Sequence, residues 1–222
     1  MYVPQHFRLP DDRVTDLLSA PHAGNLVTVH EDGPRATLIP FHLEQRDTGQ
    51  VLVTHLVRNN PQAREPITGP GLAIIDITDA YVSPHWYATN AELPNVPTWD
   101  YITIHLTGPV HLDPSPDAAL RAARALTLQT EDEATLDALG EERLTRMSRA
   151  IVAVELQVEH IEAKAKMSQN RHPDDIRGLI EHYSEHGPTD VADYLREVSL
   201  PYAEARFSQM ADLRASGGRG TL

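Results

Sequence analysis

The residues best suited to bind an anion follow a strand-like run and end at a proline. Arg58 carries a planar fork of donors that matches a phosphate group, and Asn59 and Asn60 add neutral donors at a turn. His55 precedes them, on what we expect to be the polar face of the strand. The alternative is an Asx-type turn with a solvated arginine. The segment predicts either phosphate binding or a purely structural turn.

A second polar segment, residues 164–171, follows the strand-like run near residue 155. Lys164, Lys166 and Arg171 make it locally basic in an acidic chain. Between the basic residues lie the uncharged polar side chains that could read the hydrogen-bonding edge of a ligand: Ser168, Gln169 and Asn170. The alternative is a solvated strand end followed by a helix cap.

Both tryptophans of the chain, Trp86 and Trp99, lie in neighbouring loops that prolines stiffen. Rigid loops with large flat side chains suit a flat ligand or a partner subunit. The alternative is that the two rings plug the open end of a β-barrel, since aromatic residues dominate cores and interfaces alike.

Metal binding and nucleophilic catalysis find little support. His182 and His186, among twelve histidines, are four apart on an expected helix and therefore share a face. A zinc site needs further ligands, and we expect no metal site. No GxSxG, Walker or dinucleotide-binding glycine motif is present. We name no catalytic residue, because no side chain stands out as acid, base or nucleophile.

Composition narrows the class of protein. Hydrophobic residues make up 41% of the 222 residues, which is enough for a core. The net charge of -13 argues against direct nucleic-acid binding, which lysine and arginine drive. The chain has no cysteine, no apolar stretch long enough to span a membrane and no signal-peptide pattern at its start. We therefore expect no membrane association and a cytoplasmic location.

Alternating apolar residues and turn signals predict short strands, and periods of three to four predict helices. The expected strands are residues 25–29, 36–43, 51–56, 72–77, 101–107 and 152–158. The expected helices are a short one between Pro10 and Pro21, residues 117–128, one or two short helices around Gly140 within residues 131–150, and then residues 173–186, 189–198 and 201–213. Many short strands with turns between them favour a closed or nearly closed antiparallel barrel. The glycine-rich tail from Ser216 to Gly220 is expected to be disordered.

Several motifs, in the same order, make the chain resemble the PaiB-type family of FMN-binding negative transcriptional regulators. The motifs are Met1–Phe7, Leu38–Phe41, His55–Pro61, Asp79–Tyr87, Val96–Tyr101, Ile151–Glu155 and Lys166–Asn170. The resemblance implies an α+β fold: mainly an antiparallel split β-barrel of the flavin-reductase type, with peripheral helices and a helical C-terminal extension. We expect residues 1–171 to form the FMN-binding domain, and residues 172–222 the extension with its tail.

The same resemblance implies a homodimer with FMN at the subunit interface. Arg58, Asn59 and Asn60 would hold the phosphate. The ring would face the backbone of Leu38, Ile39, Pro40 and Phe41, with His55 nearby. The facing subunit or the rim would supply Trp86, Trp99, Lys166, Ser168, Gln169 and Asn170.

Three functions remain open. FMN would carry any redox chemistry, so a flavin-dependent oxidoreductase needs no catalytic side chain. The family name implies repression of transcription, which an acidic chain would achieve through a partner protein. Haem binding is the third, because related split barrels bind haem and the many histidines permit it.

Overall fold

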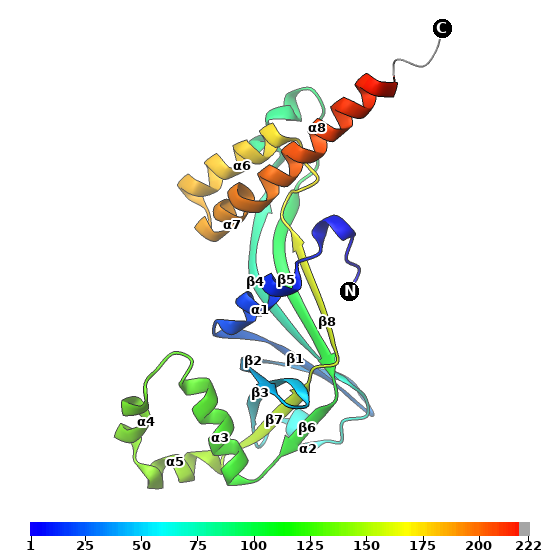
Figure 1. Cartoon of the computed structure of the whole chain (residues 1–222). Helices are drawn as coiled ribbons and strands as arrows, with labels where there is room; N and C mark the ends of the chain where they lie inside the picture. The colour runs from blue at the N-terminus through cyan, green and yellow to red at the C-terminus, as the bar shows by residue number, and fades with distance from the viewer. Residues whose placement is uncertain (218–222) are drawn as a thin grey trace. The chain divides into compact units, whose positions relative to one another are not determined.

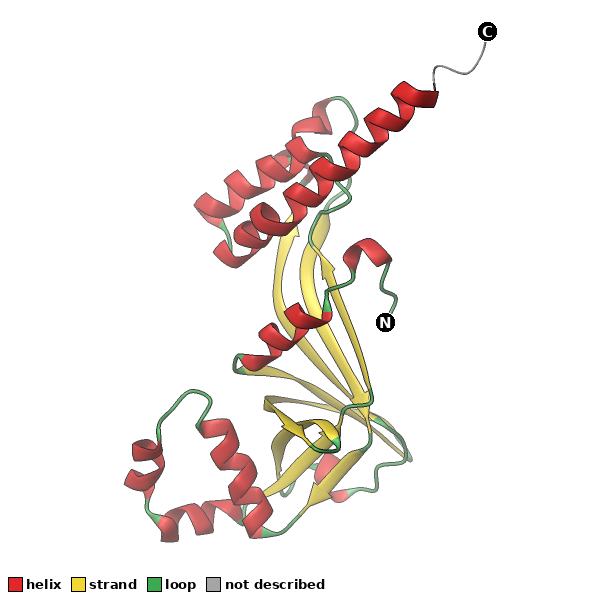
Figure 2. Ribbon diagram, viewed as in Figure 1, coloured by secondary structure: helices red, strands yellow, loops and turns green. Residues whose placement is uncertain are grey.

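The structure, a computed structural model, describes residues 1–217. Figures 1 and 2 show how strands and helices follow one another along the chain. The strands are β1 (His22–His30), β2 (Gly33–Arg46), β3 (Gly49–Val57), β4 (Gly71–Val82), β5 (Thr98–Gly108), β6 (Val110–Asp113), β7 (Ile151–Gln157) and β8 (His160–Lys166).

Eight α-helices are formed within the described range. They are α1 (Asp11–Ser19), α2 (Pro61–Arg64), α3 (Pro116–Thr127), α4 (Glu133–Leu139), α5 (Glu141–Ser148), α6 (Pro173–His186), α7 (Thr189–Tyr194) and α8 (Leu200–Gly217). Shorter helical turns are η1 (Gln5–Phe7), η2 (Pro84–Trp86) and η3 (Ala88–Ala91), and a π-helical turn, η4 (Leu195–Ser199), joins α7 to α8. None of the helices in residues 1–217 is both long and apolar enough to cross a membrane.

All strands belong to one sheet, in the order β6-β7-β3-β2-β1-β4-β5-β8. The pairs β1–β2, β1–β4, β2–β3, β3–β7 and β6–β7 are antiparallel. The tight turn between β1 and β2 depends on Gly33, whose φ of 128° suits glycine far better than other residues. The predicted antiparallel sheet with peripheral helices is confirmed.

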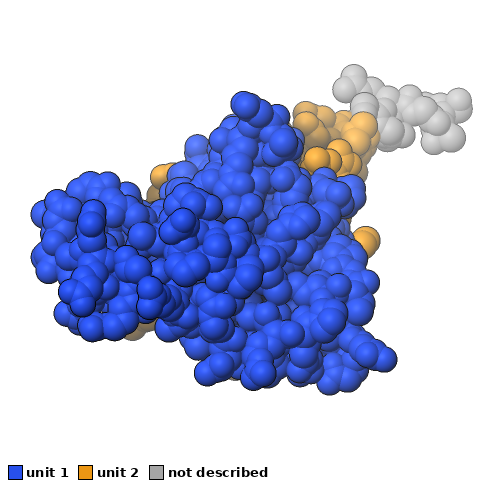
Figure 3. Space-filling model, turned by 90° about the horizontal axis from the view of Figure 1, so that it is seen from below, with its two compact units in different colours: residues 1, 10–75, 104–163 blue, residues 2–9, 76–103, 164–222 orange. Residues whose placement is uncertain are grey.

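The chain divides into two compact units, each built from separated segments (Figure 3). Unit 1 contains residue 1 and residues 10–75 and 104–163, and unit 2 contains, of the described residues, 2–9, 76–103 and 164–217. The two units are not separated by a single boundary in the sequence, because the chain passes from one unit to the other several times. The predicted boundary at residue 171 stays a prediction.

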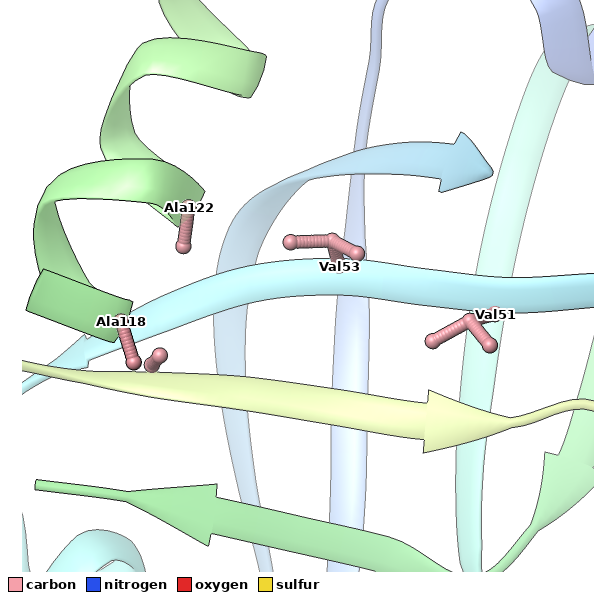
Figure 4. Close-up of a cluster of buried hydrophobic side chains, with 5 residues drawn as sticks. Val51, Val53, Ala118 and Ala122 are labelled. Atoms are coloured by element: carbon pink, nitrogen blue, oxygen red, sulfur yellow. The ribbon is translucent and has the colours of Figure 1, made fainter. Parts of the chain in front are cut away.

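The core of unit 1 includes a small cluster between α3 and the sheet. Val51 and Val53 on β3 face Ala118 and Ala122 of α3, and Ala153 on β7 completes the cluster (Figure 4). Side chains at alternate positions of a strand point to one face, so β3 presents its odd-numbered residues to the helix. Small alanines allow α3 to lie close over β3 and β7.

Unit 2 is held together by α6 and the segments that it covers. Ile176, Leu179 and Tyr183 are buried on α6, and the Tyr183 hydroxyl donates to the Tyr81 carbonyl at 2.6 Å. The helices α6, α7 and α8 lie side by side in Figure 1. The predicted helix over residues 173–186 is confirmed, and the next two differ only at their ends.

Two strands, β6 and β8, were not predicted. β6 has only four residues between two prolines. β8 places Ala163 and Ala165 on one face and charged residues on the other, and Ile161 is its only β-branched residue. Of the predicted disordered tail, residues 216 and 217 end α8 and the remainder lies outside the described residues.

Candidate functional site

The segment Leu38–Phe41 alternates across β2. Ile39 and Phe41 are buried in the core, whereas Leu38 is 66% exposed and Pro40 is also exposed. Period-two alternation causes this difference, since neighbouring side chains in a strand point to opposite faces. Leu38 and Pro40 therefore present their side chains on the outward face.

His55 and Pro40 both line an apolar cavity of about 410 Å³ in unit 1. Its other walls come from α3, α4, α5 and the start of β7, mainly through Leu120, Leu126, Leu136, Leu144, Met147 and Ile151. The buried Nδ1 of His55 has no hydrogen-bond partner among the described residues. Burial lowers the pKa of this imidazole, because desolvation disfavours the charged form. The cavity thus combines apolar walls with one polar atom that lacks a partner.

Arg58 is anchored to the backbone at the edge of the same unit. Its Nε donates to the Arg149 carbonyl at 2.8 Å, and its Nη2 donates to the carbonyls of Pro114 and Ile151 at 2.7 and 3.0 Å. Within residues 1–217, Nη1 makes no hydrogen bond. The guanidinium is therefore fixed in place with one amino group still able to donate.

The two asparagines after Arg58 differ. The Asn60 Oδ1 accepts from the Gln62 amide at 3.0 Å and so caps α2, and its Nδ2 donates to the Thr37 hydroxyl at 3.0 Å. Asn59 is exposed, and no hydrogen bond of its side chain occurs in the part of the chain described. The contacts of Asn60 are those of a structural Asx-type turn, whereas the side-chain amide of Asn59 is free to donate to a ligand.

The basic segment of unit 2 surrounds a buried carboxylate that sequence reasoning missed. Asp100 is fully buried, and the Ser168 hydroxyl donates to its two oxygens at 3.1 and 2.8 Å. Lys166 Nζ lies 3.8 Å from Asp100 and donates to the Thr98 hydroxyl at 2.9 Å and to the Trp99 carbonyl. Burial raises the pKa of Asp100 to about 6, against the opposing effects of Ser168 and Lys166. The sequence signal that could have revealed this site is the position of Asp100 in a strand, between the outward-facing Trp99 and Tyr101.

The polar residues after Lys166 form a tight turn. Ser168 has a φ of 58°. Gln169 accepts from the Met167 amide at 2.8 Å and donates to the Ala165 carbonyl at 2.7 Å. Asn170 is exposed, and its carbonyl accepts from Arg206 at 2.9 Å. The buried side chains of Ser168 and Gln169 thus fix the local backbone.

The tryptophans occupy different environments within unit 2. Trp86 stacks on His182 of α6 with ring centroids 3.7 Å apart. A Cβ on Gly178 would lie 2.4 Å from the Trp86 carbonyl, so α6 contacts this loop at backbone distance. Trp99 is 53% exposed and meets Tyr81 edge-on with centroids 5.9 Å apart. Trp86 therefore packs against α6, whereas part of the Trp99 ring is exposed and accessible to a ligand or partner.

Lys164 and Lys166 both lie over the ring of Tyr101, with Nζ 5.4 and 5.9 Å from its centroid. His182 also stacks on His186 with centroids 5.4 Å apart. In residues 1–217, no group of three or more His, Cys, Asp or Glu residues could hold a metal ion.

The order of the strands in one antiparallel sheet, with helices around it, defines the class of protein as a split barrel. A family model described as "Putative FMN-binding domain" matches residues 1–160, and the chain belongs to that family. A relative from Bacillus subtilis (strain 168), "Protease synthase and sporulation protein PAI 2", is 28% identical over 190 residues, 82% of this chain and 88% of the relative. The predicted PaiB-type family is confirmed.

Two solved structures share the fold. A FAD- and haem-binding protein from Mycobacterium smegmatis is 19% identical, with a TM-score of 0.52 over 71% of this chain and 71% of that chain. A conserved hypothetical protein from Mycobacterium tuberculosis is 13% identical, with a TM-score of 0.50 over 75% of this chain and 91% of that chain. At such identities the likeness shows the fold alone, and the predicted split-barrel fold is confirmed.

Proposed function

We propose that this chain binds FMN on the outward face of β2 and β3, beside the apolar cavity under α3, α4 and α5. The observation that carries the proposal is that cavity, lined by Pro40 and His55 and about 410 Å³ in volume. This volume lies in the usual range for small-molecule pockets, and apolar walls with few polar atoms suit a flat ring. The unpartnered Nδ1 of His55 supplies a polar contact for the ring edge.

The residues present fit the cofactor. Nη1 of Arg58 and the amide of Asn59 would hold the phosphate, and Leu38 and Pro40 would face the ring. When bound, FMN supplies hydride and one-electron transfer, and the chain binds and orients it and excludes water. We assign Trp99 and Lys166 of a second copy to the rim of the site. Trp86, Asn60, Ser168, Gln169 and Asn170 support it by fixing the loops that carry these groups.

Titration with FMN should quench flavin fluorescence in a saturable way, with one FMN bound per chain, because the ring leaves water for an enclosed site. Absorbance of the dialysed complex provides the second readout, and the same chain unfolded in urea serves as the non-binding control. A protein that stays colourless after dialysis against FMN contradicts the proposal. A strong Soret band after haem addition, without any FMN response, would favour the haem alternative.

We further propose that the chain is a homodimer in the cytoplasm. Trp99, Leu93 and Val96 are 53%, 71% and 73% exposed, which is much apolar surface for one region of a monomer. Multi-angle light scattering across a dilution series should report twice the mass of one chain. A monomer that still binds FMN stoichiometrically would rule the dimer out, and cell fractionation tests the location.

A non-enzymatic regulator remains the second candidate, favoured by the name of the Bacillus subtilis relative. The net charge of -13 favours action through a partner protein, because it repels DNA phosphates. A footprint at a defined operator by the pure chain would contradict this indirect route.

A further inference from the structure

Unit 1 contains a second cavity, of about 420 Å³, whose lining differs from that of the flavin cavity. Val53 and Ala153 contribute to it from the sheet, and Ala118 and Ala122 from α3. These small side chains form an apolar floor, part of which is visible in Figure 4. The volume is again in the range of small-molecule pockets.

The remaining walls of this charged cavity hold ionic side chains. Arg46 donates through Nη1 and Nη2 to the Glu155 carboxylate at 3.0 and 2.9 Å, and through Nε to Glu44 at 2.8 Å. The pKa of Arg46 is raised, with the Glu155 hydrogen bond as the main cause. One guanidinium is thus shared by two carboxylates, which leaves one negative charge in excess at this end.

The other end of the charged cavity carries Asp113 and Arg121. Hydrogen bonds from the Ser115 side chain and from its amide, the latter at 2.8 Å, lower the pKa of Asp113, and the charge of Arg121 lowers it further. Arg121 is exposed, and within residues 1–217 its guanidinium makes no hydrogen bond or salt bridge. The cavity is therefore lined by three carboxylates, two guanidiniums and the imidazole of His111, and of the two guanidiniums that of Arg121 is the one available to pair with a ligand.

We propose that the charged cavity binds a basic amino acid, such as lysine. Its carboxylate pairs with Arg121 and its α-ammonium lies beside Asp113, while its side-chain ammonium lies toward Glu44 and Glu155. The methylene chain covers the floor of Val53 and alanines. A net positive ligand with one carboxylate matches the excess negative charge and the single available guanidinium, whereas an anion would meet three carboxylates. This proposal does not depend on FMN binding.

Isothermal titration of the FMN-free protein at low ionic strength with L-lysine, L-norleucine and cadaverine tests the proposal. Norleucine lacks the side-chain ammonium, and cadaverine lacks the carboxylate. L-lysine should bind roughly tenfold more tightly than either, because a charge-assisted pair is lost in each analogue. Equal affinity for L-lysine and either analogue, or no binding of L-lysine at millimolar concentration, overturns it.

Two variants locate the ligand. Arg121→Gln should lower the affinity for L-lysine roughly tenfold and leave the affinity for cadaverine unchanged, since only L-lysine carries a carboxylate. Glu44→Gln should weaken both, because it removes the excess negative charge. Arg143→Gln on α5 is the matched control: it also removes one exposed arginine from unit 1 but does not line the cavity. An unchanged L-lysine affinity in Arg121→Gln, or an equal loss in Arg143→Gln, contradicts the site.

Discussion

The Arg58→Ala variant is expected to bind FMN roughly ten- to a hundredfold more weakly than the wild type, with a much smaller loss for riboflavin. Only FMN carries a phosphate, and Nη1 is the amino group of Arg58 without a partner in the described residues. Arg58→Lys should recover part of the loss, since a point charge replaces a planar fork. Flavin-fluorescence titrations with both ligands on the three proteins provide the measurement.

The structure adds a second consequence for the same variant. Arg58 donates to the carbonyls of Arg149, Pro114 and Ile151, so its removal leaves three acceptors without this donor. At about 1 kcal/mol for each hydrogen bond, less where water replaces the donor, stability should fall by about 2 kcal/mol. Urea unfolding measures this loss. Binding is then compared only under conditions in which both proteins are folded.

Riboflavin is the internal control for this prediction. If losing the carbonyl contacts shifts the walls of the flavin cavity, both ligands weaken alike. Equal losses would therefore make Arg58 a structural residue and move the search for an anion site to Lys164, Lys166 and Arg171. Unchanged FMN affinity would remove Arg58 from the site.

The fold was predictable where a segment alternates over several residues. Hydrophobic alternation marks β5 and β7 clearly, whereas β3 is marked by the apolar run Val51–Val53, which is buried on both faces of the sheet. β8 was missed because its inward residues are alanines, whose small apolar surface gives a weak signal. β6 was missed because four residues between prolines are too few to show a period. The hydrophobic pattern of the sequence therefore reveals strands with large buried side chains. It misses short or alanine-rich strands, which are held in the sheet mainly by pairing with neighbouring strands.

The candidate site shows a similar limit. The sequence marks Ser168, Gln169 and Asn60 as polar and short of charge, which fits either a ligand or a turn. In the structure Asn60 and Gln169 bond to amides two residues away, and Ser168 donates to the distant Asp100. Apolar helix residues such as Leu120 and Leu144 line the flavin cavity, yet in sequence they look like ordinary core. Which cavity a helix covers depends on long-range packing and has no local signal.

Asp100→Asn is expected to change how stability depends on pH, because burial raises the pKa of Asp100 from 3.8 to about 6. The folded state binds this proton more tightly than the unfolded state. The resulting stabilisation is fully present below the unfolded pKa and is lost as pH rises through about 6. The difference between 3.8 and about 6 corresponds to about 3 kcal/mol.

The free energy of unfolding of Asp100→Asn should therefore rise relative to that of the wild type by up to about 3 kcal/mol as pH rises from about 4 to about 7.5. Asparagine can still accept from Ser168, and Lys166 keeps its bonds to Thr98 and Trp99, so the local contacts survive the change. Urea unfolding at a series of pH values gives the two stability curves. Asp113→Asn is the control with the opposite sign, since the pKa of Asp113 is lowered and its contribution disappears on acidification. Parallel curves for wild type and Asp100→Asn would show that Asp100 is not held in a desolvating site.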